Sequence, residues 1–305
     1  MAFTAFAGGA SAPAVEPAAR RRSPIALFLL LPGIFYLVLF FVTPLISLVI
    51  TSLQEPDPLI FGQYVNAFNW QNYVSVMEQY WSHALRSAGY AALATLFALL
   101  IGFPLAYFIG ITLRPFPLIQ SLALVLVIAP FFISFLLRTL AWKQIFSVEG
   151  PVAGILSSLG ALPPGVSITG TTFSVIFGLT YNFIPFMVLP IYATLVSLDL
   201  RLLEASNDLY GSPATTFRTV TLPLSAAGVM SGTLLTFIPA AGDYINASRE
   251  FLGATDTAMI GNVIEANFLV LQNFPAAAAL SLILMAFILV LVAAYVKRSG
   301  TEDLL

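Results

Sequence analysis

Apolar residues gather along this chain in long runs that are separated by short polar segments. Six runs hold roughly 20 or more mostly apolar residues and are bounded by charged or turn-forming residues, as in helices that cross the hydrocarbon core of a bilayer. They cover residues 24–53, 84–113, 117–137, 171–198, 222–241 and 274–296. The pattern therefore predicts an all-α integral membrane protein with six transmembrane helices.

The two ends of the chain fall outside this pattern. Residues 1–19 are rich in alanine, glycine and proline and have no apolar period, so we expect a disordered tail over 1–23. Three arginines precede the first apolar run, as in a signal peptide, but the run is far longer than the roughly 7–15 apolar residues of a signal. We expect a retained first helix, one six-helix membrane domain over 24–298 and a short tail over 299–305.

The charges of the loops predict the orientation of the chain. Six crossings place both termini on one side of the membrane, and eight basic residues fall on that side against four on the other. The more basic side is cytoplasmic, so we expect cytoplasmic termini in a multi-pass protein of a cell membrane. The outer segments, about 54–83, 138–170 and 242–273, carry eight acidic residues. This acidic face favours a cationic solute or a basic docking surface, although ordinary solvated loops explain it equally well.

Composition excludes several classes of protein. Only 9% of the 305 residues are charged and 59% are hydrophobic, whereas a soluble domain carries about 25% charged residues. The chain has no cysteine and one histidine, His83, which leaves no thiolate nucleophile and no histidine-rich metal site. It also has no basic stripe for nucleic acid and no phosphate-binding G-x-x-x-x-G-K-[ST] loop. We therefore expect a non-catalytic membrane subunit that binds no cofactor and no nucleic acid.

Small residues and prolines mark features inside the predicted helices. Gly228 and Gly232 form a small-xxx-small pair, which lets one helix approach a neighbour closely. Five prolines are expected to interrupt helices, and transporters use such breaks near substrate sites, although kinks are also common elsewhere in membrane helices. These prolines are Pro104, Pro130, Pro185, Pro190 and Pro239.

The longest polar stretch on the predicted inner face, residues 197–223, carries the signals of two short helices. Asp199 is a candidate N-cap for a helix through Tyr210, and Gly211 can end that helix in a left-handed conformation. Ser212 and Pro213 then begin a second helix. Interfacial helices on lipid are usually rich in lysine, and this stretch has none. A helix-turn-helix that docks into a groove on a soluble partner fits better.

This loop carries a specific resemblance. Two stretches are similar to the EAA loop of ABC-type importer permeases: Glu204-Ala205-Ser206-Asn207-Asp208-Leu209-Tyr210 and, after it, Val220-Thr221-Leu222-Pro223. The pattern of that loop is Glu-Ala-Ala, three residues, Gly, nine residues, Ile, any residue, Leu-Pro. Ser206 replaces the second alanine and Tyr210 replaces the glycine. Because Gly211 follows directly, we expect the turn to shift by one residue.

Three further stretches resemble spermidine/putrescine importer permeases of the PotB type. They are Pro130-Phe-Phe-Ile-Ser-Phe-Leu-Leu-Arg-Thr-Leu-Ala-Trp142 with Glu149-Gly-Pro-Val152, Phe237-Ile-Pro-Ala-Ala-Gly-Asp-Tyr244, and Phe251-Leu-Gly253 with Met259-Ile-Gly-Asn-Val263. The resemblance covers about 24–298. It implies the type I (MetI-like) importer architecture and a polyamine substrate; an importer permease for another small solute is the first alternative. A secondary transporter fits less well, because it leaves the inner loop unexplained.

The resemblance also implies partners and roles. The expected partners are a second, homologous permease subunit, two copies of an ABC ATPase that bind ATP and Mg²⁺, and an external solute-binding protein. The residues expected to couple the permease to the ATPase are Glu204, Ala205, Asp208, Gly211, Phe217, Arg218 and Pro223. Those expected along the substrate path are Asp243, Tyr244, Glu265, Tyr181 and Asn182. Arg138 and Lys143 are interpreted as contacts for an acidic surface of the binding protein, or as interface anchors beside Trp142.

Overall fold

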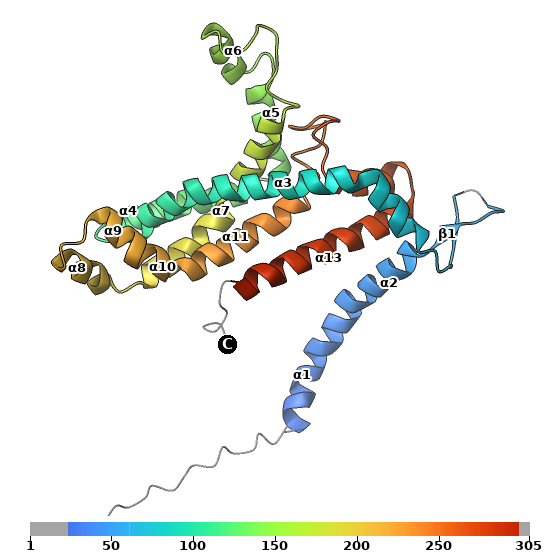
Figure 1. Cartoon of the computed structure of the whole chain (residues 1–305), viewed down its shortest axis with the longest axis horizontal. Helices are drawn as coiled ribbons and strands as arrows, with labels where there is room; N and C mark the ends of the chain where they lie inside the picture. The colour runs from blue at the N-terminus through green and yellow to red at the C-terminus, as the bar shows by residue number, and fades with distance from the viewer. Residues whose placement is uncertain (1–23, 61, 299–305) are drawn as a thin grey trace, which may run out of the picture. The chain divides into compact units, whose positions relative to one another are not determined.

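A computed structural model of the chain describes residues 24–60 and 62–298. The predicted tails 1–23 and 299–305 lie outside the described residues. The chain divides into two units at Ser47 and Leu48, and each is described by itself. Both are helical, with one two-stranded hairpin in the described part of the second unit (Figure 1).

The first unit is one apolar helical segment that runs on into the start of the second. It consists of α1 (Pro24–Leu37), the π-helical turn η1 (Val38–Val42) and α2 (Thr43–Ser52). Residues Leu29–Ser52 are long and apolar enough to span a membrane, and their most apolar stretch has no buried residue. This confirms the first predicted span.

The second unit opens with a hairpin and a very long helix. Strands β1 (Glu55–Pro56) and β2 (Tyr64–Val65) pair antiparallel, and α3 (Gln71–Tyr107) continues into the π-helical turn η2 (Phe108–Thr112). Helix α3 begins well before residue 84, where we expected the second span to start. The apolar run marks only the part of the helix that is hydrophobic all round, whereas the preceding turns carry polar residues such as Glu78 and Gln79.

The third predicted span, 117–137, is broken. It contains α4 (Pro117–Ile128), the 3₁₀ turn η3 (Ala129–Phe132) and the start of α5 (Phe135–Phe146), which is followed by α6 (Pro151–Ser158). The two halves meet at 94°. Ile133 is extended after Pro130, so of the five marked prolines only Pro130 lies at a break. Pro104, Pro185, Pro190 and Pro239 lie inside continuous helices, which corrects the expectation that they interrupt them.

The remaining helices complete the unit. Helix α7 (Thr172–Ser197) is followed by α8 (Leu200–Asp208), α9 (Pro213–Thr216), the π-helical turn η4 (Phe217–Thr221), α10 (Leu222–Leu224) and α11 (Ala226–Ala241). After a long loop come α12 (Ile260–Glu265), the π-helical turn η5 (Ala266–Val270) and α13 (Phe274–Arg298). Four helices of the described chain are individually able to span a membrane, and the expected six is reached when each of two bent pairs counts as one span.

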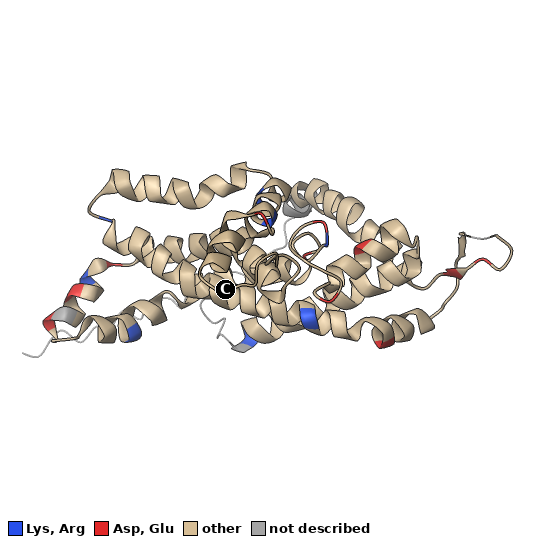
Figure 2. Ribbon diagram, turned by 90° about the horizontal axis from the view of Figure 1, so that it is seen from above, with Lys and Arg blue, Asp and Glu red and all other residues tan. Residues whose placement is uncertain are grey.

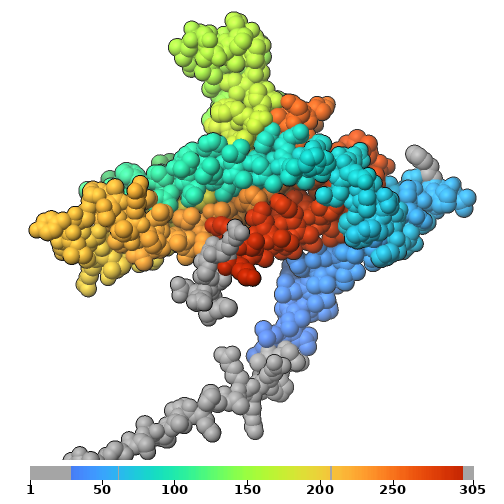
Figure 3. Space-filling view, viewed as in Figure 1, coloured from blue at the N-terminus to red at the C-terminus, as the bar shows by residue number. Residues whose placement is uncertain are grey.

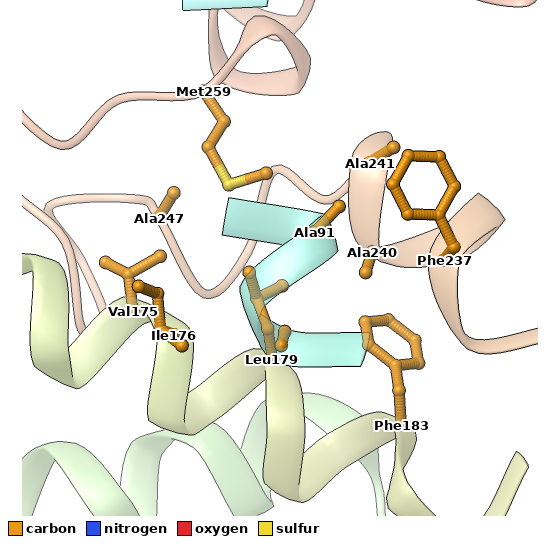
Figure 4. Close-up of a cluster of buried hydrophobic side chains, with 11 residues drawn as sticks. Ala91, Val175, Ile176, Leu179, Phe183, Phe237, Ala240, Ala241, Ala247 and Met259 are labelled. Carbon is orange, nitrogen blue, oxygen red and sulfur yellow. The ribbon is translucent and has the colours of Figure 1, made fainter. Parts of the chain in front are cut away.

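Helix α7 is the core of the second unit, packed between α3 and α11. The α3 face against it is a stripe of small residues, in which Ala94, Ala98 and Ala106 are fully buried. A Cβ added at Gly102 would lie 3.1 Å from the Met187 side chain of α7. Figure 4 shows Leu179 and Phe183 of α7 among Ala91 and Phe237 from the flanking helices.

The predicted small-xxx-small pair makes the matching contact from α11. A Cβ at Gly228 would lie 2.5 Å from Thr194 Oγ1 and 2.8 Å from Pro190 O, and one at Gly232 would lie 2.9 Å from Met187 O. Both glycines therefore let the backbones of α11 and α7 approach closely, which confirms the prediction of tight packing.

This contact gives a stability test. We expect Gly228→Ala to destabilise the protein by about 1–3 kcal/mol, because the new methyl group must push the α7 backbone away. Gly89→Ala is the matched control: Gly89 lies within α3 with no atom within 4 Å of an added Cβ, and alanine stabilises a helix by about 0.5–1 kcal/mol relative to glycine. Thermal unfolding in detergent measures both changes, and equal melting temperatures for the two variants would contradict the packing argument.

Candidate functional site

The loop between α7 and α11 forms the predicted helix-turn-helix. Asp199 caps α8, with Oδ1 accepting a hydrogen bond from Arg201 N at 3.0 Å. Ser212 caps α9, with Oγ accepting from Thr215 N at 3.2 Å, and Pro213 occupies the first helical position. Both predicted caps are confirmed, although α8 ends at Asp208 rather than at Tyr210.

The turn between α8 and α9 differs from the expectation. Tyr210 itself adopts the left-handed conformation, with φ of 59°, while Gly211 does not. Gly211 N donates to Ser206 O at 2.9 Å, which is the six-residue hydrogen bond of a Schellman motif with Tyr210 at the position that glycine usually fills. The turn therefore does not shift. Position 211 instead requires glycine because a side chain would not fit there: a Cβ would lie 2.7 Å from Ser206 O.

Two side-chain contacts hold the loop together and fix it to the helices. Ser206 Oγ and Thr216 Oγ1 share a hydrogen bond of 2.8 Å between α8 and α9. The Phe217 ring packs edge-on against Phe103 and Tyr107 of α3, with centroid distances of 5.4 and 6.4 Å. Phe217 thus anchors the loop to α3. The ring contacts therefore link the loop directly to α3.

The other predicted coupling residues lie on the surface. Glu204, Ala205, Asp208, Arg218 and Pro223 are all exposed in the second unit. Figure 3 shows this part of the chain in gold as a protruding surface, and Figure 2 shows acidic and basic residues together on the short helices, whereas the long helices are mostly uncharged. The arrangement offers a rigid, charged surface for a partner.

A buried polar cluster lies against the N-terminal half of α7. Asp243 is 7% exposed and accepts hydrogen bonds from Asn246 N at 2.8 Å and Asn246 Nδ2 at 3.1 Å. Asn246 Oδ1 accepts from Asn182 Nδ2 at 3.0 Å, and Asn182 Nδ2 also donates to Thr139 Oγ1 at 3.1 Å. The cluster joins α5, α7 and the loop after α11. A glycine at 178 makes room for it, since a Cβ there would lie 2.6 Å from Asn246 Oδ1.

Some polar atoms near this cluster have no partner among the described residues. They are Asn182 Oδ1 and the Nε and Nη1 atoms of Arg138, which is buried with its guanidinium 5.7 Å from the centroid of the Phe135 ring. Burial corrects the interpretation of Arg138 as a surface contact for a binding protein. Lys143 lies nearer the surface, but its Nζ donates to Glu250 O at 2.7 Å and so ties α5 to the loop after α11.

Two other predicted path residues meet in a second place, a depression of about 490 Å³ that we name the acidic pocket. Tyr244 and Glu265 line it together with Glu250 and Phe251. Partial burial, followed by the nearby charge of Glu250, raises the pKa of Glu265 above its ordinary value. Two carboxylates and two aromatic rings around one hollow suit an amine cation.

The structure thus divides the five predicted path residues among three places. Tyr244 and Glu265 share the acidic pocket, while Asp243 and Asn182 belong to the buried cluster. Tyr181 lies in neither of these groups: its ring contacts Trp142 at 5.2 Å and Phe177 at 6.4 Å. Helix α7 is continuous at Tyr181 and Asn182, contrary to the expectation of an interruption there.

Sequence reasoning did not assign Thr139, Asn246 or Glu250 to these places. Asn246 had a signal, because Asp243 is followed three residues later by a group that its carboxylate can bind, as in a capped turn. Glu250 was counted only among the outer acidic residues, and nothing in the sequence marks Thr139. No group of three or more metal-binding side chains occurs within the described part of the chain.

Comparison with known proteins places the chain in a family. No family model matches the sequence. The spermidine/putrescine transport system permease protein PotB of Haemophilus influenzae is 33% identical over 271 residues, which cover 87% of this chain and 90% of that protein. The protein of the same name from Escherichia coli is 34% identical over 250 residues, with 82% and 88% coverage. The chain belongs to the PotB family of permeases.

Other proteins that are similar to this chain agree with the assignment to the PotB family. The inner membrane ABC transporter permease protein YdcU of Escherichia coli is 30% identical over 72% of the chain and 72% of its own length. The fold is that of a bacterial alginate ABC transporter, with a TM-score of 0.65, 17% identity and coverage of 92% and 97%. An inward-facing MetNI methionine ABC transporter gives a TM-score of 0.53 at 16% identity, covering 74% and 94%. The chain is accordingly a multi-pass permease with the type I importer fold.

The buried cluster of this PotB-family chain predicts a pH effect. Asp243 lies beyond the end of α11, and burial raises its pKa from 3.8 to about 6, opposed by hydrogen bonds led by those from Asn246. In the folded protein the Asp243 carboxyl group therefore keeps its proton to a higher pH than in the unfolded chain. As pH rises from about 4 to about 6, the contribution of Asp243 to the free energy of unfolding falls. Asp243→Asn should remove that part of the pH dependence of thermal unfolding in detergent. Parallel profiles for both proteins would contradict the burial of a titrating carboxyl group.

Proposed function

We propose that this permease passes polyamines from an external binding protein into the cytoplasm, driven by two ATPase subunits that bind ATP and Mg²⁺, and that a homologous permease completes the pathway. The observation that carries the proposal is the similarity to the PotB proteins over more than four fifths of the chain. The acidic pocket supports the choice of substrate, because a polyamine is a flexible chain of cations.

The acidic pocket is the proposed contact for the solute on its way to the membrane interior. Glu250 and Glu265 would neutralise amine groups, and the Tyr244 and Phe251 rings would contact the cationic methylene chain. Burial and, after it, the charge of Glu250 raise the pKa of Glu265, and a bound cation would oppose both effects by favouring the charged carboxylate. Charge attraction therefore favours binding at this site.

The helix-turn-helix is the proposed contact for the ATPase. The Ser206–Thr216 hydrogen bond and the packing of Phe217 on α3 make it a rigid element, so closure of an ATPase dimer would be passed to the long helices as a rigid-body movement. Reversal of a 1:99 preference between two arrangements needs roughly 5.5 kcal/mol of differential binding, which ATP binding at two sites can supply.

The coupling role is tested by charge reversal at Glu204. We expect Glu204→Arg to weaken association with the ATPase and to reduce solute-stimulated ATP hydrolysis, because Glu204 is exposed on the proposed contact surface. Glu149→Arg is the control, since Glu149 is exposed on the segment after α5. Co-purification and hydrolysis assays on the full complex measure both. If Glu204→Arg and the control behave alike, Glu204 is not part of the contact.

The substrate role is tested at the acidic pocket. We expect the double variant Glu250→Gln, Glu265→Gln to reduce spermidine uptake at least tenfold, since both residues line one hollow. Uptake by Glu149→Gln should be unchanged. Uptake assays in proteoliposomes with spermidine, putrescine, an amino acid and a sugar measure the effect. Unchanged polyamine uptake by the double variant would exclude the pocket, and transport of only the neutral solutes would exclude the polyamine assignment.

A further inference from the structure

Tyr210 is held in a costly conformation at the tip of the helix-turn-helix. Its φ of 59° is left-handed, which costs a residue with a Cβ roughly 1–2 kcal/mol relative to the right-handed region. Its side chain is fully exposed, at 100%, and has no hydrogen bond or ring contact in the described part of the chain. The hydrogen bond from Gly211 N to Ser206 O offsets part of this cost, but no contact of the Tyr210 side chain among the described residues does.

The fold itself does not require a tyrosine at this position. A Schellman turn takes glycine most readily, and a side chain that points fully into solvent packs against nothing. The only other described non-glycine residue with positive φ is Gln272, in the loop before α13. Strain of this kind persists at sites where a partner makes use of it.

The surroundings of Tyr210 form a small apolar tip on a polar loop. Leu209, beside Tyr210, is 82% exposed, while the acidic residues Glu204 and Asp208 lie on the short helix α8 that precedes it. The Gly211–Ser206 and Ser206–Thr216 hydrogen bonds fix the backbone of the turn, so the Cα–Cβ bond of Tyr210 points in a defined direction. Aromatic side chains that project from a fixed backbone are common anchors of protein interfaces.

We propose that Tyr210 is an aromatic anchor that inserts into an apolar pocket on the partner ATPase and sets the affinity of this permease for that ATPase. The inference rests on the proposed function, because it takes the same helix-turn-helix as the ATPase contact. The occupant is argued from continuity with the exposed surface around Glu204, the proposed contact for the ATPase. The cost of the left-handed backbone is then offset in the complex by burial of the ring.

The experiment measures the affinity of the purified ATPase subunit for the permease complex in nanodiscs. We expect Tyr210→Asn to weaken binding at least tenfold, because asparagine tolerates the left-handed conformation but lacks the ring. Tyr210→Phe should stay within threefold of the parent. Tyr210→Gly should weaken binding while raising the melting temperature, which separates loss of the anchor from loss of folding. Gln272→Gly relieves the same kind of strain elsewhere and should leave binding unchanged.

The outcomes separate this inference from the proposed function. If Glu204→Arg abolishes binding and Tyr210→Asn does not weaken it, the ATPase contact stands and the anchor is wrong. If neither variant changes binding, both are wrong. A Tyr210→Trp variant identifies the environment of the ring: its fluorescence, compared with the parent, should shift to the blue only when the ATPase is added. A blue shift in nanodiscs without ATPase would place the ring in lipid and overturn the inference.

Discussion

The close approach of α3 and α11 to α7 is the interaction on which the rest of the second unit depends. Helices gain no hydrophobic energy by associating within lipid, so their packing relies on van der Waals contact between backbones that come near each other. Gly102 on α3, Gly110 on η2, and Gly228 and Gly232 on α11 leave no room for a Cβ without displacing α7 or its side chains. These contacts make α7 the fixed reference for the unit.

Both proposed sites are attached to that reference helix. At one end, Arg114 donates from its guanidinium to Leu198 O at 3.0 Å and Val196 O at 3.1 Å, so the chain before α4 caps α7 where the helix-turn-helix begins. Toward the other end, Ser174 Oγ donates to Leu252 O at 2.8 Å, and Asn182 holds Asn246. A rigid α7 therefore links the proposed ATPase contact to the loop that carries the acidic pocket.

The sequence predicts those features that depend on local patterns. Hydrophobic runs locate the apolar helices, and the caps at Asp199 and Ser212 follow from residue type alone. Breaks and continuity are different, because proline marks both: α7 runs through Pro185 and Pro190 without a break, whereas a 65° bend follows Pro223. Packing of neighbouring helices decides such cases. The cluster of Thr139, Asn182 and Asn246 joins residues that are distant in sequence, so it emerges only from the fold.

Two of the few charged side chains in the described part of the chain are buried, and burying a charged group costs free energy. Arg138 and Asp243 are both about nine-tenths buried, and neither faces an opposite charge in the described hydrogen bonds. Removing such a group from water costs several kcal/mol unless polar partners in the protein replace the water molecules. Asn246 replaces water around Asp243, whereas two Arg138 nitrogens and Asn182 Oδ1 stay unpaired. These unpaired donors and the unpaired acceptor lower the stability of the fold, because a buried polar atom without a partner has lost its hydrogen bonds to water.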